Sequence, residues 1–423
     1  MPAAMPLPLT GAKRAFVLAM LMTVGILNFL DRQIVGILAV PIKAELGLSD
    51  LQLGLMGGLA FALFYTTLGL PIALLSDRFN RSWIITICLA FWSAMTAACG
   101  LAQNFWHLFL ARVGVGIGEA GGGPATYSII SDYFPPEQRA RALGVYSFSI
   151  PIGSALGVVM GGVIASYIDW RAAFFIAGLV GISLAPFFKW VVREPLRGQY
   201  DPDTARTAPA PVGEVFRILI GKRSFWLLSL GAASGTMVAY GLFFWLPSFF
   251  VRSHGLDLLD ASLAFGALLV LGGVPGIWAG GYFADRLGTG RRAAYATIPA
   301  IAFLCTVPLF AIGVLAPSFP VMFVVMVIPI ALGLAWVGPI ISAIQQIVSP
   351  NMRATASAVF LLITNLFGLG LGTVLLGSLS DGLQARFGAD SLRYSILAGS
   401  AFYVIGAALF FWGSRTLEEE WEK

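Results

Sequence analysis

Long apolar runs recur along almost the whole chain, and each is about as long as a helix that crosses a membrane. A bilayer core takes roughly 20 apolar residues per helix, and in lipid only helices and closed barrels satisfy their own backbone hydrogen bonds. The chain of 423 residues is 58% hydrophobic and only 11% charged, whereas a soluble domain is about 25% charged. The sequence therefore predicts an all-α membrane protein.

We place twelve membrane-spanning helices in two sets of six. The first set is Ala15–Leu38, Leu51–Leu75, Trp83–Ala102, Trp106–Ile130, Ala142–Tyr167 and Ala172–Val192. The second set is Phe225–Val251, Ala261–Ala284, Ala293–Leu315, Phe319–Val348, Ala354–Leu379 and Tyr394–Trp412. A polar, Pro-rich segment with the sequence RTAPAPV is typical of a linker. The predicted domains are a bundle over 1–192, a cytoplasmic linker over 193–223 and a second bundle over 224–423.

Basic residues predict the orientation in the membrane. With both termini inside, the inner side holds 19 of the 26 Lys and Arg residues. The outer loops hold five, and two lie within spans. Because basic residues collect on the cytoplasmic side, we expect both termini in the cytoplasm. The first run follows Lys13 and Arg14 directly and is too long for a signal peptide, so we expect it to remain as a span.

The two halves repeat one another. GLPIALLSDRFNRS follows the second span and GGYFADRLGTGRR follows the eighth, which aligns Asp77 with Asp285. FPPEQRARALG and VSPNMRATASA follow the fourth and tenth spans and align Arg139 with Arg353. The offsets, 208 and 214 residues, are nearly equal. A duplication into two six-helix bundles follows, and such bundles hold substrate near the bilayer midplane where they meet.

Several of these motifs resemble a known family. DRFNR and GYFADRLGTGRR resemble the loop signature of the major facilitator superfamily, and LARVGVGIGEAGGG resembles its fourth-helix motif. NFLDR, RVGVGIGEA, DYFPPEQRARAL, IPIGSALG and VVREPLRG resemble the spinster family within that superfamily. The resemblance implies the superfamily's fold and a transporter of the bacterial inner membrane. It also implies lysophospholipids or sphingosine-1-phosphate as the substrate class, and a monomer.

Four charged residues lie inside predicted spans away from the span ends: Asp31 and Arg32 in the first, Arg112 and Glu119 in the fourth. Arg112 and Glu119 are seven residues apart, so they lie about 20° apart on one helix face. Each charge costs roughly 2.5–3.5 kcal/mol at a helix centre facing lipid. We therefore expect all four to face a shared wet cavity. Thr126 continues the stripe on the fourth helix, and Asn28 shares a face with Asp31 and Arg32 on the first.

This cluster predicts a proton-coupling site. Asp31 and Glu119 would exchange protons, and Arg112 would compete with the proton for Glu119. A static ion-pair network that holds the first helix to the fourth is the alternative. For Arg32 a role toward the cytoplasm or between helices also stays open, because adjacent helix residues point about 100° apart.

The second half has no Asp, Glu, Lys or Arg inside its spans away from their ends. Its sequence AYGLFFWLPSFF is aromatic and apolar, and a cleft with one ionic and one apolar wall suits an amphiphile. Simple packing or lipid contact is the alternative for each aromatic residue. The residues predicted to bind substrate are Arg112, Glu119, Asn28, Thr126, Tyr240, Phe243, Phe244, Trp245, Gln345 and Asn365.

Loop charges are predicted to gate the transporter through contacts between the two halves. These are Asp77, Arg78, Arg81, Asp285, Arg286, Arg139 and Arg353. The glycines of GIGEAGGG and IPIGSALGVVMGG favour close helix packing over a phosphate site.

Three functions remain open on the sequence. The first is a proton-linked lysolipid transporter, the second a multidrug or small-solute proton antiporter, and the third a membrane-embedded enzyme or receptor. No nucleotide-binding loop is present, so ATP is not expected as the driver. The three cysteines stand isolated in apolar runs and there are only two histidines, so neither a metal site nor a catalytic cluster is predicted. We therefore expect no enzyme activity and no nucleic-acid partner.

Overall fold

The structure is a computed structural model that describes residues 11–197, 200, 212–288, 291–349 and 352–421. Contacts between Cα atoms divide the chain into two compact units. The first unit holds the described residues of 1–48 and 60–206, and the second holds those of 49–59 and 207–423. Most of the predicted linker sequence RTAPAPV lies outside the described residues.

Within the described ranges the fold is all-helical, as predicted. The first unit contains α1 (Gly11–Ile37), α2 (Ala39–Leu46), α4 (Ala60–Arg78), α5 (Arg81–Cys99), α6 (Phe105–Glu119), α7 (Gly122–Tyr133), α8 (Pro136–Ser147), α9 (Ser149–Tyr167) and α10 (Trp170–Val191). The second unit contains α3 (Asp50–Gly54), η1 (Leu55–Leu59), α11 (Val212–Gly221), α12 (Arg223–His254), α13 (Leu258–Leu268), η3 (Leu269–Gly273), α14 (Val274–Gly288), α15 (Ala294–Val314), α16 (Phe319–Leu334), α17 (Val337–Gln346), α18 (Arg353–Thr364), η5 (Asn365–Leu371), α19 (Gly372–Phe387), η6 (Gly388–Asp390), α20 (Ser391–Gly399) and α21 (Ala401–Glu420).

Ten helical stretches of the described chain are long and apolar enough to cross a membrane. One of them, Thr355–Glu420, holds both the eleventh and the twelfth predicted spans. The fourth predicted span is interrupted between α6 and α7, in the glycine-rich run that follows Glu119. Glycine lowers helix stability by about 1 kcal/mol relative to alanine, which explains why the helix breaks there.

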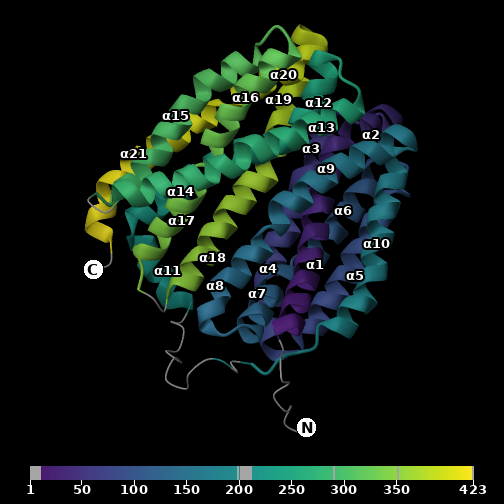
Figure 1. Ribbon diagram of the computed structural model, residues 1–423. Coiled ribbons are helices and arrows are strands. Elements are labelled where there is room, and N and C mark those ends of the chain that lie inside the picture. Colours follow the sequence, from purple (N-terminus) through teal and green to yellow (C-terminus); the bar gives the residue numbers. More distant parts are fainter. Residues whose placement is uncertain (1–10, 198–199, 201–211, 289–290, 350–351, 422–423) are drawn as a thin grey trace. The chain divides into compact units, whose positions relative to one another are not determined.

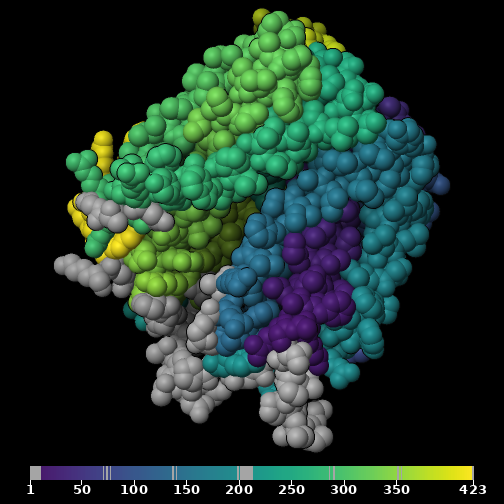
Figure 2. Space-filling model, in the orientation of Figure 1, coloured from purple at the N-terminus to yellow at the C-terminus, as the bar shows by residue number. Residues whose placement is uncertain are grey.

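Helix α9 packs along α1 in the first unit, as Figure 1 shows and as the surface in Figure 2 shows for the blue and purple segments. A Cβ atom at Gly153 would lie 2.5 Å from the carbonyl oxygen of Ile26, and one at Gly157 would lie 2.5 Å from that of Leu30. The four-residue glycine spacing therefore serves close backbone approach, as the sequence predicted.

In the second unit, the short helix α3 is held by a buried carboxylate. Asp50 is fully buried, and its two carboxylate oxygens each accept a hydrogen bond of 2.7 Å from Arg252 on α12. The hydroxyl of Ser380 on α19 donates another, of 2.7 Å. Asp381 then accepts the backbone N–H groups of Asp50 and Leu51 at the start of α3. A charge-assisted, bidentate contact of this kind stabilises the packing of α3 and also fixes the orientation of the two side chains.

The two halves of the chain share details that support the predicted duplication. The π-helical turns η1 and η3 begin 214 residues apart, each inside a helix that continues on both sides. Arg139 Nε donates to the carbonyl oxygen of Ser131 eight residues earlier, and Arg353 Nε donates in the same way to that of Gln345, both at 2.9 Å. Equivalent residues of the two repeats thus make equivalent contacts.

Candidate functional site

Three charged side chains are buried together in the first unit. Asp31 on α1 is 4% exposed, while Arg112 and Glu119 on α6 are each 1% exposed. Glu119 and Arg112 lie on one face of α6, as their spacing predicted, and both interact electrostatically with groups on α1. Because a lone buried charge is costly, the cluster exists only through mutual compensation between the two helices.

Glu119 takes its direct counter-charge from Arg32. The Nε atom of Arg32 donates a 2.9 Å hydrogen bond to Oε2 of Glu119, and this carboxylate is wholly buried. Arg112 lies further away and acts on Glu119 through its charge alone. The direct ion-pair partner of Glu119 is thus Arg32, and Arg112 adds a second cation nearby.

The carboxylate of Asp31 accepts a hydrogen bond from a hydroxyl group. It lies beside Arg112, which has a hydrogen-bond donor that it does not use. Thr96 on α5 donates a 3.0 Å hydrogen bond to Oδ2 of Asp31. Arg112 reaches the backbone oxygen of Asp31 at 3.5 Å, a long contact, and its buried Nε has no hydrogen-bond partner among the described residues. Cys99 also lies near both charges.

Three aromatic rings surround the guanidinium of Arg32. Its central carbon lies 5.0 Å from the ring centre of Phe29, 4.9 Å from that of Phe61 and 4.5 Å from that of Tyr65. Phe61 and Tyr65 stack on one another along α4, with ring centres 5.1 Å apart. Sequence analysis missed these rings, although their four-residue spacing places them on one face of the second predicted span.

The other two polar candidates of the first unit border this cluster. Asn28 is half-buried on α1 and its side chain interacts with Glu119. Thr126 is buried on α7, where it lies beside Tyr146. Because the chain breaks between α6 and α7, Thr126 does not extend a continuous helical stripe from Glu119.

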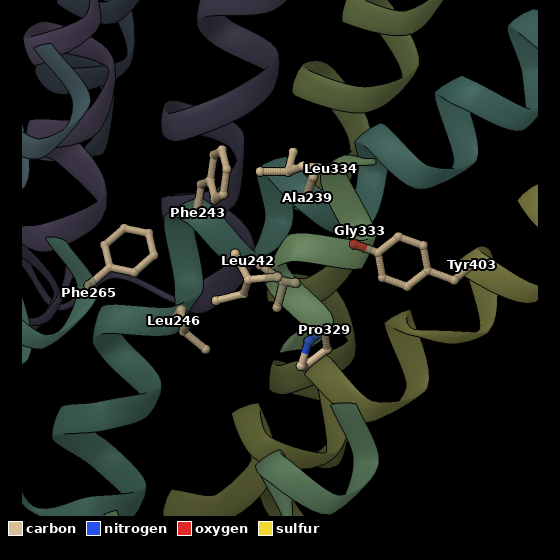
Figure 3. Close-up of a pocket in the computed structure, with 10 residues that line it drawn as sticks. Ala239, Leu242, Phe243, Leu246, Phe265, Pro329, Gly333, Leu334 and Tyr403 are labelled. Atoms are coloured by element: carbon tan, nitrogen blue, oxygen red, sulfur yellow. The ribbon is translucent and has the colours of Figure 1, made fainter. Parts of the chain in front are cut away.

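An apolar pocket lies in the second unit, between α12, α13, α16 and α21 (Figure 3). Its volume is about 20 Å³, little more than one water molecule needs. Phe243 lines it, and the hydroxyl of Tyr403 points toward Gly333 at its edge. A Cβ atom at Gly333 would lie 2.7 Å from that hydroxyl oxygen.

The remaining candidates of the second unit are spread over several environments. Trp245 is fully buried and donates its indole N–H to the carbonyl oxygen of Thr373, at 2.9 Å. Phe244 is 5% exposed and packs edge-on against Trp245. Half-buried Tyr240 lies edge-on to Phe243. Gln345 is exposed on α17, and half-buried Asn365 begins the π-turn η5.

Several of the predicted gating residues make contacts within their own unit. Buried Arg81 contacts Asp132 and Glu194. Arg139 and Arg353 hydrogen-bond carbonyl groups at the ends of α7 and α17. Arg78 and Arg286 are exposed, and Arg286 lies 3.1 Å from the hydroxyl of Tyr282. The side chains of Asp77 and Asp285 lie outside the described part of the structure.

Near the end of α2 in the first unit, Glu45 joins α2 to α10. It accepts hydrogen bonds from the indole of Trp170 and the guanidinium of Arg171. These two hydrogen bonds, more than the charge of Arg171, lower the pKa of Glu45. Arg171 also donates to the carbonyl oxygens of Gly100 and Ala102, so this corner ties three segments of the unit together.

Comparisons with known proteins agree on one family. A family model described as Major Facilitator Superfamily matches residues 21–373. An MFS-type efflux pump of Mycolicibacterium smegmatis is 33% identical over 96% of this chain and 94% of its own length. Protein spinster homolog 1 of Homo sapiens is 28% identical over 95% of this chain and 81% of its own length.

Two solved structures of a bacterial homologue of the human lysosomal transporter Spinster are also similar. The inward-facing, unoccupied form has a TM-score of 0.91 at 34% identity and covers 98% of this chain and 99% of that one. The inward-facing, occupied form has a TM-score of 0.86 at 33% identity, with the same coverage of both chains.

Proposed function

Since the chain belongs to the major facilitator superfamily, and within it to the spinster family, we propose that it moves an amphipathic lipid across the bacterial inner membrane by alternating access, linked to protons. The lipid is of the lysophospholipid or sphingosine-1-phosphate class. Family membership makes the chain a multi-pass membrane transporter of a small molecule rather than an enzyme.

The observation that carries the proposal is the buried charge cluster of the first unit. Two carboxylates and Arg112 with almost no exposure, together with Arg32 at 13%, are an expensive arrangement in a membrane helix bundle, and such residues mark transport pathways. The second unit offers the opposite chemistry, since the pocket there is apolar, edged by one phenol hydroxyl and, at about 20 Å³, smaller than a lipid chain.

Proton linkage rests on Glu119 and its exchangeable partner. The groups that face it are Arg32 and Asn28 on α1 and Arg112 on its own helix, with Asp31 nearby. While Arg32 is bound, the buried carboxylate is compensated as an anion. When a conformational change removes that cation, the low-dielectric surroundings favour the protonated acid. Proton uptake and release would then accompany each cycle.

The test is a pH-jump uptake assay in proteoliposomes with the double variant Asp31→Asn, Glu119→Gln. We expect it to fold, because both substitutions are close to isosteric, and to lose the dependence of lysolipid uptake on the pH gradient. The matched control is Asp260→Asn, Glu419→Gln, which changes two exposed carboxylates and should keep that dependence. Unchanged pH dependence in the double variant would reject the proton linkage.

A proton-driven drug or small-solute antiporter is the second candidate. Its support is the 33% identical relative named as an efflux pump. Direct binding separates the two functions: a transporter of lysolipids binds a twelve-carbon lysolipid in preference to a cationic drug such as ethidium. The reverse preference would favour drug efflux.

A further inference from the structure

Helix α11 adjoins the end of a membrane span in the second unit. One residue, Lys222, separates it from α12, which is long and apolar enough to cross a bilayer. The carboxylate of Glu420, at the end of α21, accepts the backbone N–H groups of Arg223 and Ser224, which begin α12, at 2.9 and 3.1 Å. The end of one span thus caps the start of another, and α11 leaves this corner at the level where both spans end.

The same end of the unit carries residues typical of a membrane–water interface. Trp421 packs against Tyr295 at the start of α15, with ring centres 5.4 Å apart, and the guanidinium of Arg292 lies 5.5 Å from the Trp421 ring. Tryptophan and tyrosine collect at helix ends where acyl chains meet head groups. Helix α11 therefore lies at the depth of the lipid head groups.

Two apolar side chains of α11 are exposed side by side. Phe216 is 43% exposed and Ile220 is 67% exposed, and their four-residue spacing places them on one helix face. On the neighbouring face Val215 and Leu219 are buried, where α11 packs against α12 and α18. Exposed apolar residues beside a packed face are costly in water, but they suit a helix that lies in the plane of the interface.

Positive charge accompanies this apolar pair. The ten residues from 214 to 223 hold three basic residues and one acidic residue, a net charge of +2. Arg217 and Arg223 are exposed, and each basic side chain near an anionic lipid surface strengthens the attraction to it. Glu214, the acidic residue, is exposed and points about 160° away from Phe216. Glu418 and Glu419 are exposed on α21 at this end, so the attraction belongs to α11 itself.

We propose that α11 is an interfacial helix that binds anionic phospholipids of the surrounding bilayer. Phe216 and Ile220 insert among the upper parts of the acyl chains, and Arg217 and Arg223 bind the phosphates. The occupant of this face is lipid because the face continues directly from a membrane span at head-group depth and carries the complementary charge. This role is independent of which molecule the protein transports.

The depth of α11 is tested with a bimane fluorophore on single cysteines, in a variant whose three cysteines are replaced by Ala. The full-length protein is placed in nanodiscs that contain phosphatidylglycerol with a nitroxide on the acyl chain, which quenches bimane at short range. Bimane at Phe216→Cys or Ile220→Cys should be strongly quenched. Bimane at Glu214→Cys, on the opposite side of the helix, is the matched control and should be quenched several-fold less.

The preference for anionic lipid is measured at Ile220→Cys. Nitroxide-labelled phosphatidylglycerol should quench more than nitroxide-labelled phosphatidylcholine at the same mole fraction. Arg217→Gln with Arg223→Gln should lower this enrichment by up to roughly fivefold for each charge removed. Arg386→Gln, which changes an exposed arginine near the end of α19, should leave it unchanged.

Three results would overturn the proposal. Weak quenching at Phe216→Cys and Ile220→Cys would show that water or another protein segment covers this face. Equal quenching at Glu214→Cys would show that the helix has no lipid-facing side, and equal quenching by the two lipids would exclude the preference for anionic lipid. Each result leaves the proposed function standing, because none of them measures transport.

Discussion

Arg81 shows how partners far away in the sequence determine the structural role of a single residue. It is 2% exposed, and its guanidinium donates to Asp132 and Ser128 on α7 and, at 2.7 Å, to Glu194 after α10. The loop motif predicted that Arg81 acts in gating. The contacts of the first unit add a structural task, because this arginine compensates a buried carboxylate at the end of α7.

Removal of Arg81 should therefore destabilise the protein. Arg81→Leu removes the guanidinium that contacts the carboxylate of Asp132, on a residue 6% exposed, and breaking a buried pair typically costs about 3–5 kcal/mol. We expect a clearly lower unfolding temperature in detergent by intrinsic fluorescence. The control Arg78→Leu changes an exposed arginine of the same loop and should alter stability by about 0.5 kcal/mol or less. Equal effects of the two variants would contradict this assignment.

At the scale of elements, the start of the second predicted span is an inserted piece of the second unit. Residues 49–59 belong to that unit by their contacts, while Ala60 begins the part of the same helix that belongs to the first. The π-turn η1 stands at this junction, and its repeat η3 stands at the equivalent place in α13–α14. Such turns interrupt the regular hydrogen-bond ladder and often occur at functional positions.

Gly58 in this turn should not tolerate a side chain. A Cβ atom there would lie 2.0 Å from the hydroxyl oxygen of Thr373 and 2.7 Å from the carbonyl oxygen of Leu369. Overpacking of this kind costs about 1–3 kcal/mol, so Gly58→Ala should lower the unfolding temperature. Gly123→Ala is the matched control in α7, where nothing lies within 4 Å of the new Cβ, and should be neutral or gain up to about 1 kcal/mol. If Gly58→Ala and Gly123→Ala are equally stable, the prediction is wrong, and α19 must shift to make room for the new methyl group.

For the whole molecule, the testable property is its orientation. The basic residues predict that both ends of the chain are cytoplasmic. In a variant with Cys88, Cys99 and Cys305 replaced by Ala, a single cysteine at Ala12 or Glu419 should react with an impermeant maleimide only after cells are permeabilised. One at Gln103, exposed between α5 and α6, should react in intact spheroplasts. Labelling of Ala12→Cys in intact spheroplasts would show that the N-terminus lies outside, which contradicts the predicted topology.

Sequence alone determined the class of fold and the repeat, and it singled out the four charged residues that the structure brings together in the first unit. These are local properties: the hydropathy of about 20 consecutive residues, the spacing of residues on one helix, and short sequence motifs. The spacing of Arg112 and Glu119 was enough to place both on one face of α6.

Only the tertiary structure decided which charges pair and what surrounds them. Arg32 and Glu119 are 87 residues apart, and nothing in the sequence distinguishes that pair from one between Glu119 and Arg112. The aromatic rings around Arg32 come from both α1 and α4. The hydropathy pattern also did not reveal the π-turns, since η1 and η3 lie inside helices that continue on both sides. Pairing and close packing arise from distances across helices, which a one-dimensional pattern does not contain.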